Sequence, residues 1–206
     1  MIYSFIQKGG ARPMSTDSEH IRDERREQIK KAALKVFAQY GLIGTKMSMI
    51  AKEAKISDGL SYRYFKSKDE ILTELVQSAV DGSNEAFAFI GSMPGTPVEK
   101  LRVLAQEILQ EDNHSFILMQ QVFAAREVPA EVARIIADYD PMSIIGALTP
   151  IVAEGQKNGQ FIDGDARELA NWYLTALVGL MNVNTSEYEF YSRPTPEFML
   201  RLLLKH

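Results

Sequence analysis

One stretch, residues 45–72, constrains the fold of this chain more than any other. Its sequence, TKMSMIAKEAKISDGLSYRYFKSKDEIL, predicts a short helix, a tight turn, a second short helix and the start of a longer one. We expect Thr45 to be the N-cap of the first helix and Ser57 to cap the second through its hydroxyl. Two helices joined by such a turn form a helix-turn-helix, whose second helix enters the DNA major groove. The stretch therefore predicts a DNA-binding motif.

The order of residue types within the stretch is more specific than the motif alone. It resembles the helix-turn-helix of the TetR family of bacterial transcriptional regulators, with the pattern Thr-x-apolar-x-x-Ile-Ala, apolar-Ser-x-Gly, Tyr-x-Tyr/His-Phe-x-x-Lys. The matching residues are Thr45, Met47, Ile50, Ala51, Ile56, Ser57, Gly59, Tyr62, Tyr64, Phe65 and Lys68. The alternative is an ordinary helical hairpin with its tyrosines in a core. That alternative does not explain why the glycine, the two tyrosines and the lysine occur together.

The resemblance implies a surface that binds a double-stranded, palindromic DNA operator. Lys68 lies at a helix N-terminus, where anions bind, and the resemblance assigns it to the DNA backbone. We expect further phosphate contacts from Lys46, Tyr62 and Tyr64, and base-edge contacts from Ser48, Leu60 and Arg63. The complete predicted DNA-binding set is Thr45, Lys46, Ser48, Ser57, Asp58, Gly59, Leu60, Tyr62, Arg63, Tyr64 and Lys68.

The motif also departs from the family pattern at several positions. Lys55 stands where the family usually has glycine, and a positive φ there would cost lysine about 1 kcal/mol. Ser61 occupies a position that is usually aliphatic. Asp58 gives the second helix an acidic start, which could accept a hydrogen bond from cytosine N4, while Leu60 could contact a thymine methyl. We therefore expect a base preference that differs from that of relatives.

Charge is distributed unevenly along the chain, whose net charge is −4. Residues 15–70 hold twelve Lys/Arg and nine Asp/Glu, whereas residues 71–206 hold nine and eighteen. The basic excess lies with the motif, where phosphates must be neutralised. Arg22, Arg25, Arg26, Lys30 and Lys31 precede it on a predicted helix at 18–40, and we interpret most of them as a solvated face, although one or two near the start could contact phosphate.

Helical patterns continue to the end of the chain, and no strand signal stands out. Apolar periodicity predicts helices at 68–90, 97–110, 114–127, 129–157, 165–183 and 195–204, with a break or kink in 129–157 at Pro141 and Pro150. Gly41 is placed to end the first helix in a left-handed conformation. We predict an all-α protein with a flexible extension at 1–16, a DNA-binding domain at 17–70 and a ligand-binding and dimerisation domain at 71–206.

The two final predicted helices are apolar on nearly all sides, as in LANWYLTALVGLMNV and FMLRLLL. Such helices must be buried from several directions, and the surplus surface could be covered by a second copy of the chain. The resemblance implies the same, because family members usually dimerise through a bundle of their last two major helices. The alternative is burial within a single chain.

Aromatic residues and methionines concentrate in two segments of the predicted second domain. With a few polar groups they suit a pocket for a small apolar effector, which the resemblance also implies. They suit a core equally well, and for any single residue a core position is the simpler interpretation. Trp172 needs a partner for its indole N–H if it is buried, which favours a pocket. The candidate ligand-binding residues are Phe116, Met119, Gln120, Phe123, Tyr139, Met142, Trp172 and Tyr173.

Other classes of function find little support. The chain has no cysteine and three separated histidines, and it lacks phosphate-cradling loops and nucleophile elbows, so we expect no enzyme, cofactor or metal. No apolar run reaches membrane-spanning length and residues 1–14 are no convincing signal peptide, which predicts a cytoplasmic protein. The expected function is a dimeric repressor that an effector releases from DNA. The alternatives are an activator or architectural DNA-binding protein without effector, or a small-molecule-binding protein whose DNA binding is lost.

Overall fold

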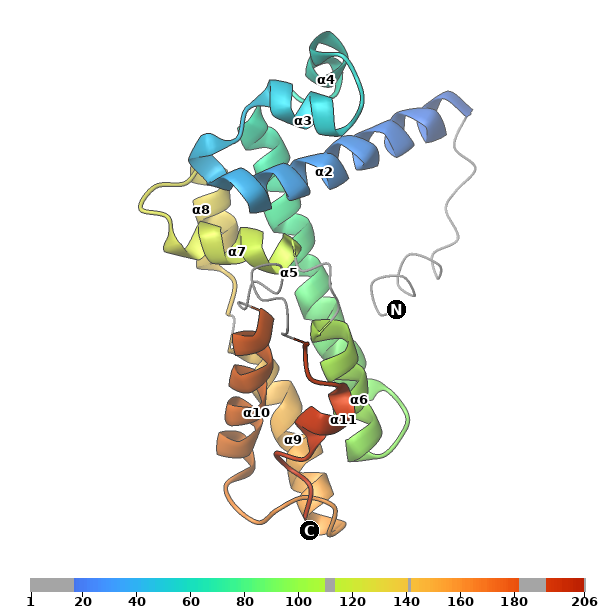
Figure 1. Cartoon of the computed structure of the whole chain (residues 1–206), viewed down its shortest axis with the longest axis vertical. Helices are drawn as coiled ribbons and strands as arrows, with labels where there is room; N and C mark the ends of the chain where they lie inside the picture. Colours follow the sequence, from blue (N-terminus) through green and yellow to red (C-terminus); the bar gives the residue numbers. More distant parts are fainter. Residues whose placement is uncertain (1–16, 110–113, 141, 182–191, 206) are drawn as a thin grey trace. The chain divides into compact units, whose positions relative to one another are not determined.

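The computed structural model describes residues 17–109, 114–140, 142–181 and 192–205, and its named elements are helices (Figure 1). The all-α prediction is confirmed: β-structure in the described residues amounts to one isolated bridge between Phe161 and Leu204. The extension predicted at residues 1–16 lies outside the described part of the chain.

The helices pack into two compact units. The head unit comprises the described residues of 17–82 and 114–139, and the body unit comprises those of 83–113 and 140–206. The helix α5 (Lys68–Ser92) contributes residues to both. The units do not coincide with the predicted domains, because residues 114–139 join the head by packing although they follow residue 70 in the chain.

The long helix α2 (Asp17–Gly44) is the support of the head unit. Apolar residues at helical spacing form a stripe in which Ile29, Ala33 and Phe37 are fully inaccessible, whereas Tyr40 at its end is 51% exposed. Gly41 has the positive φ expected of it, 73°, but its ψ of 173° is extended, so the helix kinks at Gly41 and a further helical turn ends at Gly44. The chain therefore changes direction at Gly41, just before the helix-turn-helix.

The helix-turn-helix consists of α3 (Met47–Glu53) and α4 (Asp58–Tyr64). Lys55 in the turn has a φ of 55°, so the conformation anticipated for a glycine-like position is present with lysine in it. Ser57 is the N-cap of α4, and its hydroxyl accepts a hydrogen bond from the Leu60 N–H, as predicted. The buried hydroxyl of Ser61 is satisfied by donating to the Asp58 carbonyl at 2.7 Å.

Two further helices complete the head unit, α7 (His114–Ala124) and α8 (Ala130–Ala137). Leu118, Val122 and Val132 from these helices enter the same core as α2, α3 and the first turns of α5. The side-chain amide of Gln121 donates to the Ala38 carbonyl of α2 at 3.2 Å. Figure 1 shows α7 beside α2, in agreement with these contacts. The helix-turn-helix thus rests on a core that α2, α5, α7 and α8 form together with it.

The body unit packs α6 (Pro97–Ile108), α9 (Ser143–Lys157), α10 (Ala166–Met181) and α11 (Pro196–Leu200) around one core. Leu101, Leu148 and Leu177 are fully buried at its centre. The buried hydroxyl of Tyr173 donates to the Leu101 carbonyl at 3.3 Å, and burial raises the pKa of this phenol.

Two sequence-based expectations about the last helices need correction, those for Pro150 and for the length of the final helix. The predicted break within 129–157 is present, since the segment is divided into α8 and α9, but α9 runs unbroken through Pro150, where the Thr149 hydroxyl donates to the Ile145 carbonyl. The last helix is shorter than the predicted 195–204 and ends at Leu200. The following residues form a turn and pair with residues 160–162, because the Ile162 N–H donates to the Leu203 carbonyl.

Candidate nucleic-acid interface

The helix α4 divides its side chains between the head core and solvent. Ser61 is buried and Phe65, just after the helix, is 1% exposed. The opposite side carries Asp58, Gly59, Tyr62 and Arg63, all exposed, and Tyr62 remains 55% accessible despite its size. A helix with one buried side and one exposed side of polar and aromatic residues has the form of a recognition helix, the helix that reads bases in the major groove; we call it the reading helix.

Gly59 on this face has no role in the packing of the protein itself. A Cβ added there would meet no atom within 4 Å, and the residue is helical without a positive φ. Glycine inside a helix is less favourable than alanine by about 0.5–1 kcal/mol. Packing within the chain therefore does not explain glycine at this position.

At the start of α3 the structure corrects one prediction. Lys46, not Thr45, is the N-cap, and it makes no capping hydrogen bond through its side chain. Thr45 is 1% exposed and its hydroxyl donates to the Gly41 carbonyl at 2.8 Å, so it closes the end of α2. A buried threonine offers no surface to DNA, whereas Lys46 and Ser48 beside it are exposed.

Lys68, the first residue of α5, points back at the link between α2 and α3. Its ammonium donates to three main-chain carbonyls, those of Leu42, Ile43 and Thr45, at 2.8, 3.3 and 3.0 Å. The resemblance assigned this lysine to the DNA backbone, and that role stays a prediction. The structure adds an intramolecular role that the sequence did not indicate, because the carbonyls lie more than twenty residues earlier.

Arg26 on α2 is a residue that the sequence analysis misassigned to a solvated face. Its guanidinium donates to the Tyr64 carbonyl at 2.7 Å, stacks on Phe65 at 4.2 Å from the ring centroid and forms an ion pair with Glu74 of α5. A signal was present in the sequence: Arg26 lies three residues before Ile29 and seven before Ala33, in line with the buried stripe. Charge led us to place it outside.

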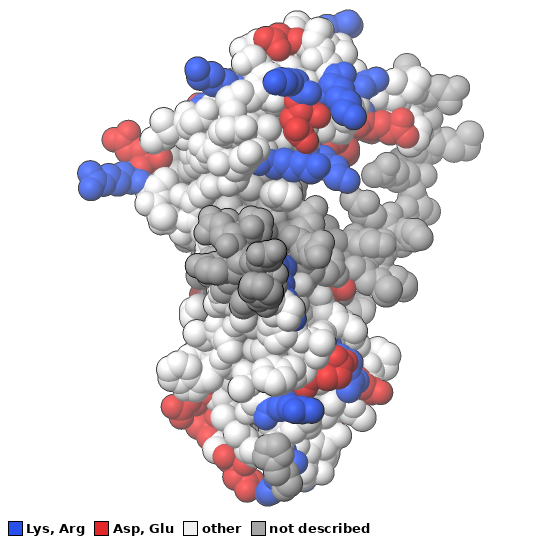
Figure 2. Space-filling model, in the orientation of Figure 1, with Lys and Arg blue, Asp and Glu red and all other residues white. Residues whose placement is uncertain are grey.

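Two other arginines of the head unit face solvent. Arg22 of α2 and Arg63 of α4 line one hollow of about 330 Å³ together with Ile21 and Tyr64. Figure 2 shows Lys and Arg side chains over the part of the surface formed by α2, α3 and α4, with acidic side chains between them. The hollow thus brings a residue of the long helix next to the end of the reading helix.

The candidate ligand-binding residues fall in both units. Phe116, Met119, Gln120, Phe123 and Tyr139 belong to the head unit, where Phe123 and Tyr139 stack with ring centroids 6.2 Å apart. Met142, Trp172 and Tyr173 belong to the body unit. Tyr173 is a core residue, whereas Trp172 is 61% exposed and its indole N–H donates to Glu168 at 3.5 Å. The indole of Trp172 is therefore not buried, contrary to the expectation, and the effector site stays a prediction.

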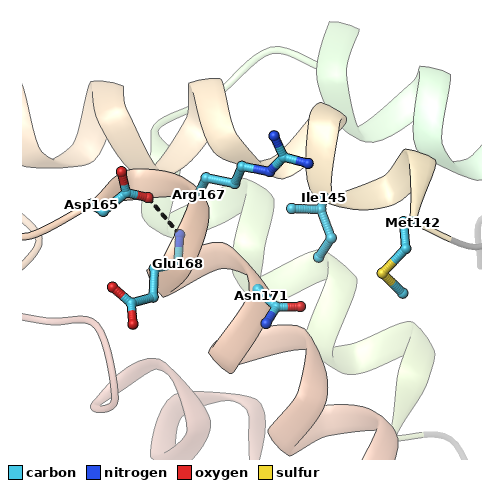
Figure 3. Close-up of a pocket in the computed structure, with 6 residues that line it drawn as sticks. All are labelled: Met142, Ile145, Asp165, Arg167, Glu168 and Asn171. Carbon is cyan, nitrogen blue, oxygen red and sulfur yellow. Dashed lines mark hydrogen bonds between the residues drawn. The ribbon is translucent and has the colours of Figure 1, made fainter.

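The body unit has an open hollow of about 380 Å³ near the start of α10 (Figure 3). Its lining residues are Met142, Ile145, Asp165, Arg167, Glu168 and Asn171, of which Met142 belongs to the predicted ligand-binding set. Asp165 accepts a hydrogen bond from the Glu168 main-chain N–H at 2.8 Å, which caps α10. Three charged residues make this lining unsuited to a largely apolar molecule.

Within the described ranges no three His, Asp or Glu side chains gather as metal ligands would, and no helix there has the length and hydrophobicity to cross a bilayer. The chain has no cysteine. The exposed face of α3 and α4 is thus the best-defined candidate site.

Comparison with protein families agrees with this assignment. Residues 29–75 match the family described as bacterial regulatory proteins, tetR family. The regulator HbdR of Aromatoleum sp. (strain CIB) is 46% identical over 59 residues, which cover 29% of this chain and 26% of that protein. The regulator AcrR of Shigella flexneri is 27% identical over 124 residues, 58% of each chain. The chain thus matches less than two thirds of the length of either relative.

Solved structures extend the similarity to most of the chain. The ketosteroid transcriptional regulator KstR2 of Mycobacterium tuberculosis has a TM-score of 0.64 at 20% identity, covering 88% of this chain and 96% of that one. AibR, solved with isovaleryl coenzyme A and operator DNA, has a TM-score of 0.61 at 19% identity, covering 86% and 94%. At these identities the similarity establishes the fold.

Proposed function

This chain belongs to the TetR family of bacterial regulatory proteins through its DNA-binding domain, and from that premise we propose that it is a sequence-specific transcriptional regulator. The observation that carries the proposal is the exposed face of α4, where Gly59, Tyr62 and Arg63 stand on a buried base. Tyr62 supplies a hydroxyl for a phosphate, and Arg63 supplies a planar guanidinium that can bind guanine through two hydrogen bonds.

The neighbouring residues have complementary roles in this proposal. Lys46 and Ser48 are exposed on α3, the helix that lies against the DNA backbone in such motifs. Leu60 and Tyr64 are partly exposed and border the α4 face. The carboxylate of Asp58 is stabilised by the positive end of the α4 dipole and would be repelled by a phosphate. We therefore assign Asp58 to a contact with a base edge.

Regulation follows from linkage. We propose a repressor that acts in the cytoplasm and leaves a palindromic operator when a small apolar effector binds. Two reading helices must match successive major grooves, so an effector that favours another spacing shifts the population away from DNA by its differential affinity. The helix α5 belongs to both units and is the element through which such a change would pass. Native mass spectrometry of the purified chain identifies a retained effector, and loss of DNA binding on its addition tests the repressor assignment.

The DNA-binding proposal is tested by selecting duplexes from a random pool with the full chain. We expect a palindromic sequence with two half-sites about one helical turn apart, bound with steep salt dependence. Binding that does not distinguish the selected duplex from an unrelated one of the same length would overturn the proposal of a sequence-specific regulator.

We further propose that the chain acts as a homodimer through α10 and α11. Their surfaces carry Trp172, and Phe198 with the adjacent Leu202, all at least half exposed in a single chain. Trp172 is the single tryptophan, so its fluorescence reports on this surface alone. We expect blue-shifted emission and protection from acrylamide when the chain associates. A dimer, shown by sedimentation, in which Trp172 is quenched as freely as in the monomer would contradict this interface.

A further inference from the structure

Both helices of the helix-turn-helix end on side chains of α2. The Tyr64 carbonyl, at the end of α4, accepts from Arg26 at 2.7 Å. The Ala54 carbonyl, at the end of α3, accepts from the Gln28 amide, also at 2.7 Å. The last carbonyls of a helix lack partners within the helix, so each of these side chains supplies what the helix end requires. Two residues of one helix thereby hold the C-terminal ends of both helices of the motif.

Arg26 makes contacts that Gln28 does not. Its guanidinium stacks on the ring of Phe65, which is itself buried, and pairs with Glu74 of α5. The guanidinium of Arg26 therefore connects three helices. It belongs to α2, donates to the last carbonyl of α4 and forms an ion pair with Glu74 of α5. The Arg26 and Glu74 side chains are 28% and 34% exposed, so the pair is partly shielded from solvent.

We propose that Arg26 is a positioning residue that sets the orientation of the reading helix, and that Glu74 fixes the orientation of its guanidinium. The argument rests on the proposed DNA-binding function. A guanidinium can stack on Phe65 while donating along its edge to two acceptors, and an ammonium cannot reproduce this planar arrangement. Because Glu74 belongs to α5, a shift in the first turns of α5 changes the position of Arg26 and with it the end of α4.

A residue that orients the reading helix affects the affinity for the specific DNA sequence more than it affects the affinity for DNA of any sequence. Base contacts depend on the angle at which α4 enters the groove, whereas non-specific binding depends on the charge presented to phosphates. Arg26 has its charge directed at Glu74, the Tyr64 carbonyl and Phe65. Its replacement should therefore lower affinity for the selected duplex and leave non-specific affinity nearly unchanged.

The test measures dissociation constants of the full chain for the selected duplex and for an unrelated duplex of equal length, over a series of salt concentrations. We expect Arg26→Lys to reduce the ratio of the two affinities by about tenfold, the value of one charge-assisted hydrogen bond. Arg134→Lys is the matched control, because that guanidinium pairs with Glu131 on its own helix in the same unit, and the ratio should not change.

A second variant separates positioning from phosphate binding. Arg26→Gln should reduce the ratio while the slope of log K against log salt stays the same, whereas loss of one phosphate contact would lower the slope by about 0.9. Partial unfolding does not imitate the expected result, because inactive protein raises both apparent dissociation constants by one factor and leaves their ratio unchanged. Glu74→Gln should reduce the ratio in the same direction.

The results also separate this inference from the proposal on which it rests. If the wild-type chain does not discriminate between the two duplexes, the proposed function is wrong. If the wild-type chain discriminates and Arg26→Lys retains the full ratio, the positioning role of Arg26 is overturned. A slope lowered by about 0.9 in Arg26→Gln would equally overturn it and assign Arg26 to a phosphate.

Discussion

The ammonium nitrogen of Lys68 lies 2.8 Å from the carbonyl oxygen of Leu42, across the link that joins α2 to α3. The same ammonium also reaches the carbonyls of Ile43 and Thr45. The first residue of α5 thus supplies donors to a segment of chain whose carbonyls leave the helical pattern. It holds the start of the helix-turn-helix in place, just as Arg26 holds its end.

Removing the ammonium of Lys68 should therefore destabilise the head unit. We expect Lys68→Met to lower the free energy of unfolding by about 1.5–3 kcal/mol, the contribution of a hydrogen bond to a charged group, measured by urea denaturation. Lys66→Met, at an exposed position nearby, is the control and should have little effect. Unchanged unfolding together with a lower salt slope of DNA binding would instead make Lys68 purely a phosphate contact.

Gly59→Ala should have opposite effects on folding and on DNA binding. The added methyl group meets no atom of the chain, and alanine favours the helix by about 0.5–1 kcal/mol. The same group would stand on the face proposed to approach DNA, so affinity for the selected duplex should fall. Thermal unfolding and DNA titration measure the two effects. A variant that is more stable and binds DNA as tightly would show that α4 does not approach DNA at this residue.

Arg22 and Arg63 line the same hollow but should make different contacts. We assign Arg22 to a phosphate, so we expect Arg22→Gln to lower the salt slope by about 0.9 on any duplex. Arg63→Gln should cost about 1–3 kcal/mol on the selected duplex in excess of its effect on an unrelated one. Arg134→Gln provides the control for loss of a charge. Equal effects of Arg63→Gln on both duplexes would make it another phosphate contact.

The sequence predicted those parts of the head unit that depend on local chemistry. The hydroxyl of Ser57 caps α4, Gly41 has a positive φ, and Lys55 takes the conformation expected of glycine in the turn. The first two follow from the residue and its immediate neighbours, whereas the third follows from the family pattern, because lysine itself disfavours a positive φ. The apolar stripe of α2 was predictable for the same reason, since its period is set by the helix itself.

Interactions between distant segments could not be predicted in this way. Thr45 looked like a cap because of its residue type, yet the fold buries it against the Gly41 carbonyl. Arg26 and Lys68 carry charges that normally face water, and both are turned inward by partners far along the chain. Packing also assigned α7 and α8 to the head unit, which no pattern within residues 114–139 indicated.

Two glycines of α9 give a matched test of the body core. A Cβ at Gly155 would overlap the buried ring of Phe161, whereas a Cβ at Gly146 would meet no atom within 4 Å. We expect Gly155→Ala to destabilise the protein by about 3 kcal/mol through overpacking. Gly146→Ala should stabilise it by about 0.5–1 kcal/mol. Similar unfolding midpoints for the two variants would contradict the close contact between α9 and Phe161.

The stability of the body unit should depend on pH in the acid range because of Glu99 at the start of α6. Hydrogen bonds from the main-chain N–H and the hydroxyl of Thr96, helped by the charge of Arg102, hold the pKa of Glu99 below its usual value of 4.5. Because the folded-state pKa is depressed, ionised Glu99 stabilises the fold above the unfolded pKa, and this contribution is lost as pH falls through the folded value. Glu99→Gln should therefore unfold at a lower temperature than wild type at pH 7, with the difference shrinking below pH 4.5. Glu154→Gln, at an exposed acid of α9, serves as the control. A difference in unfolding temperature that persists at low pH would show that the reciprocal hydrogen bonds between Thr96 and Glu99 do not depend on the charge of Glu99.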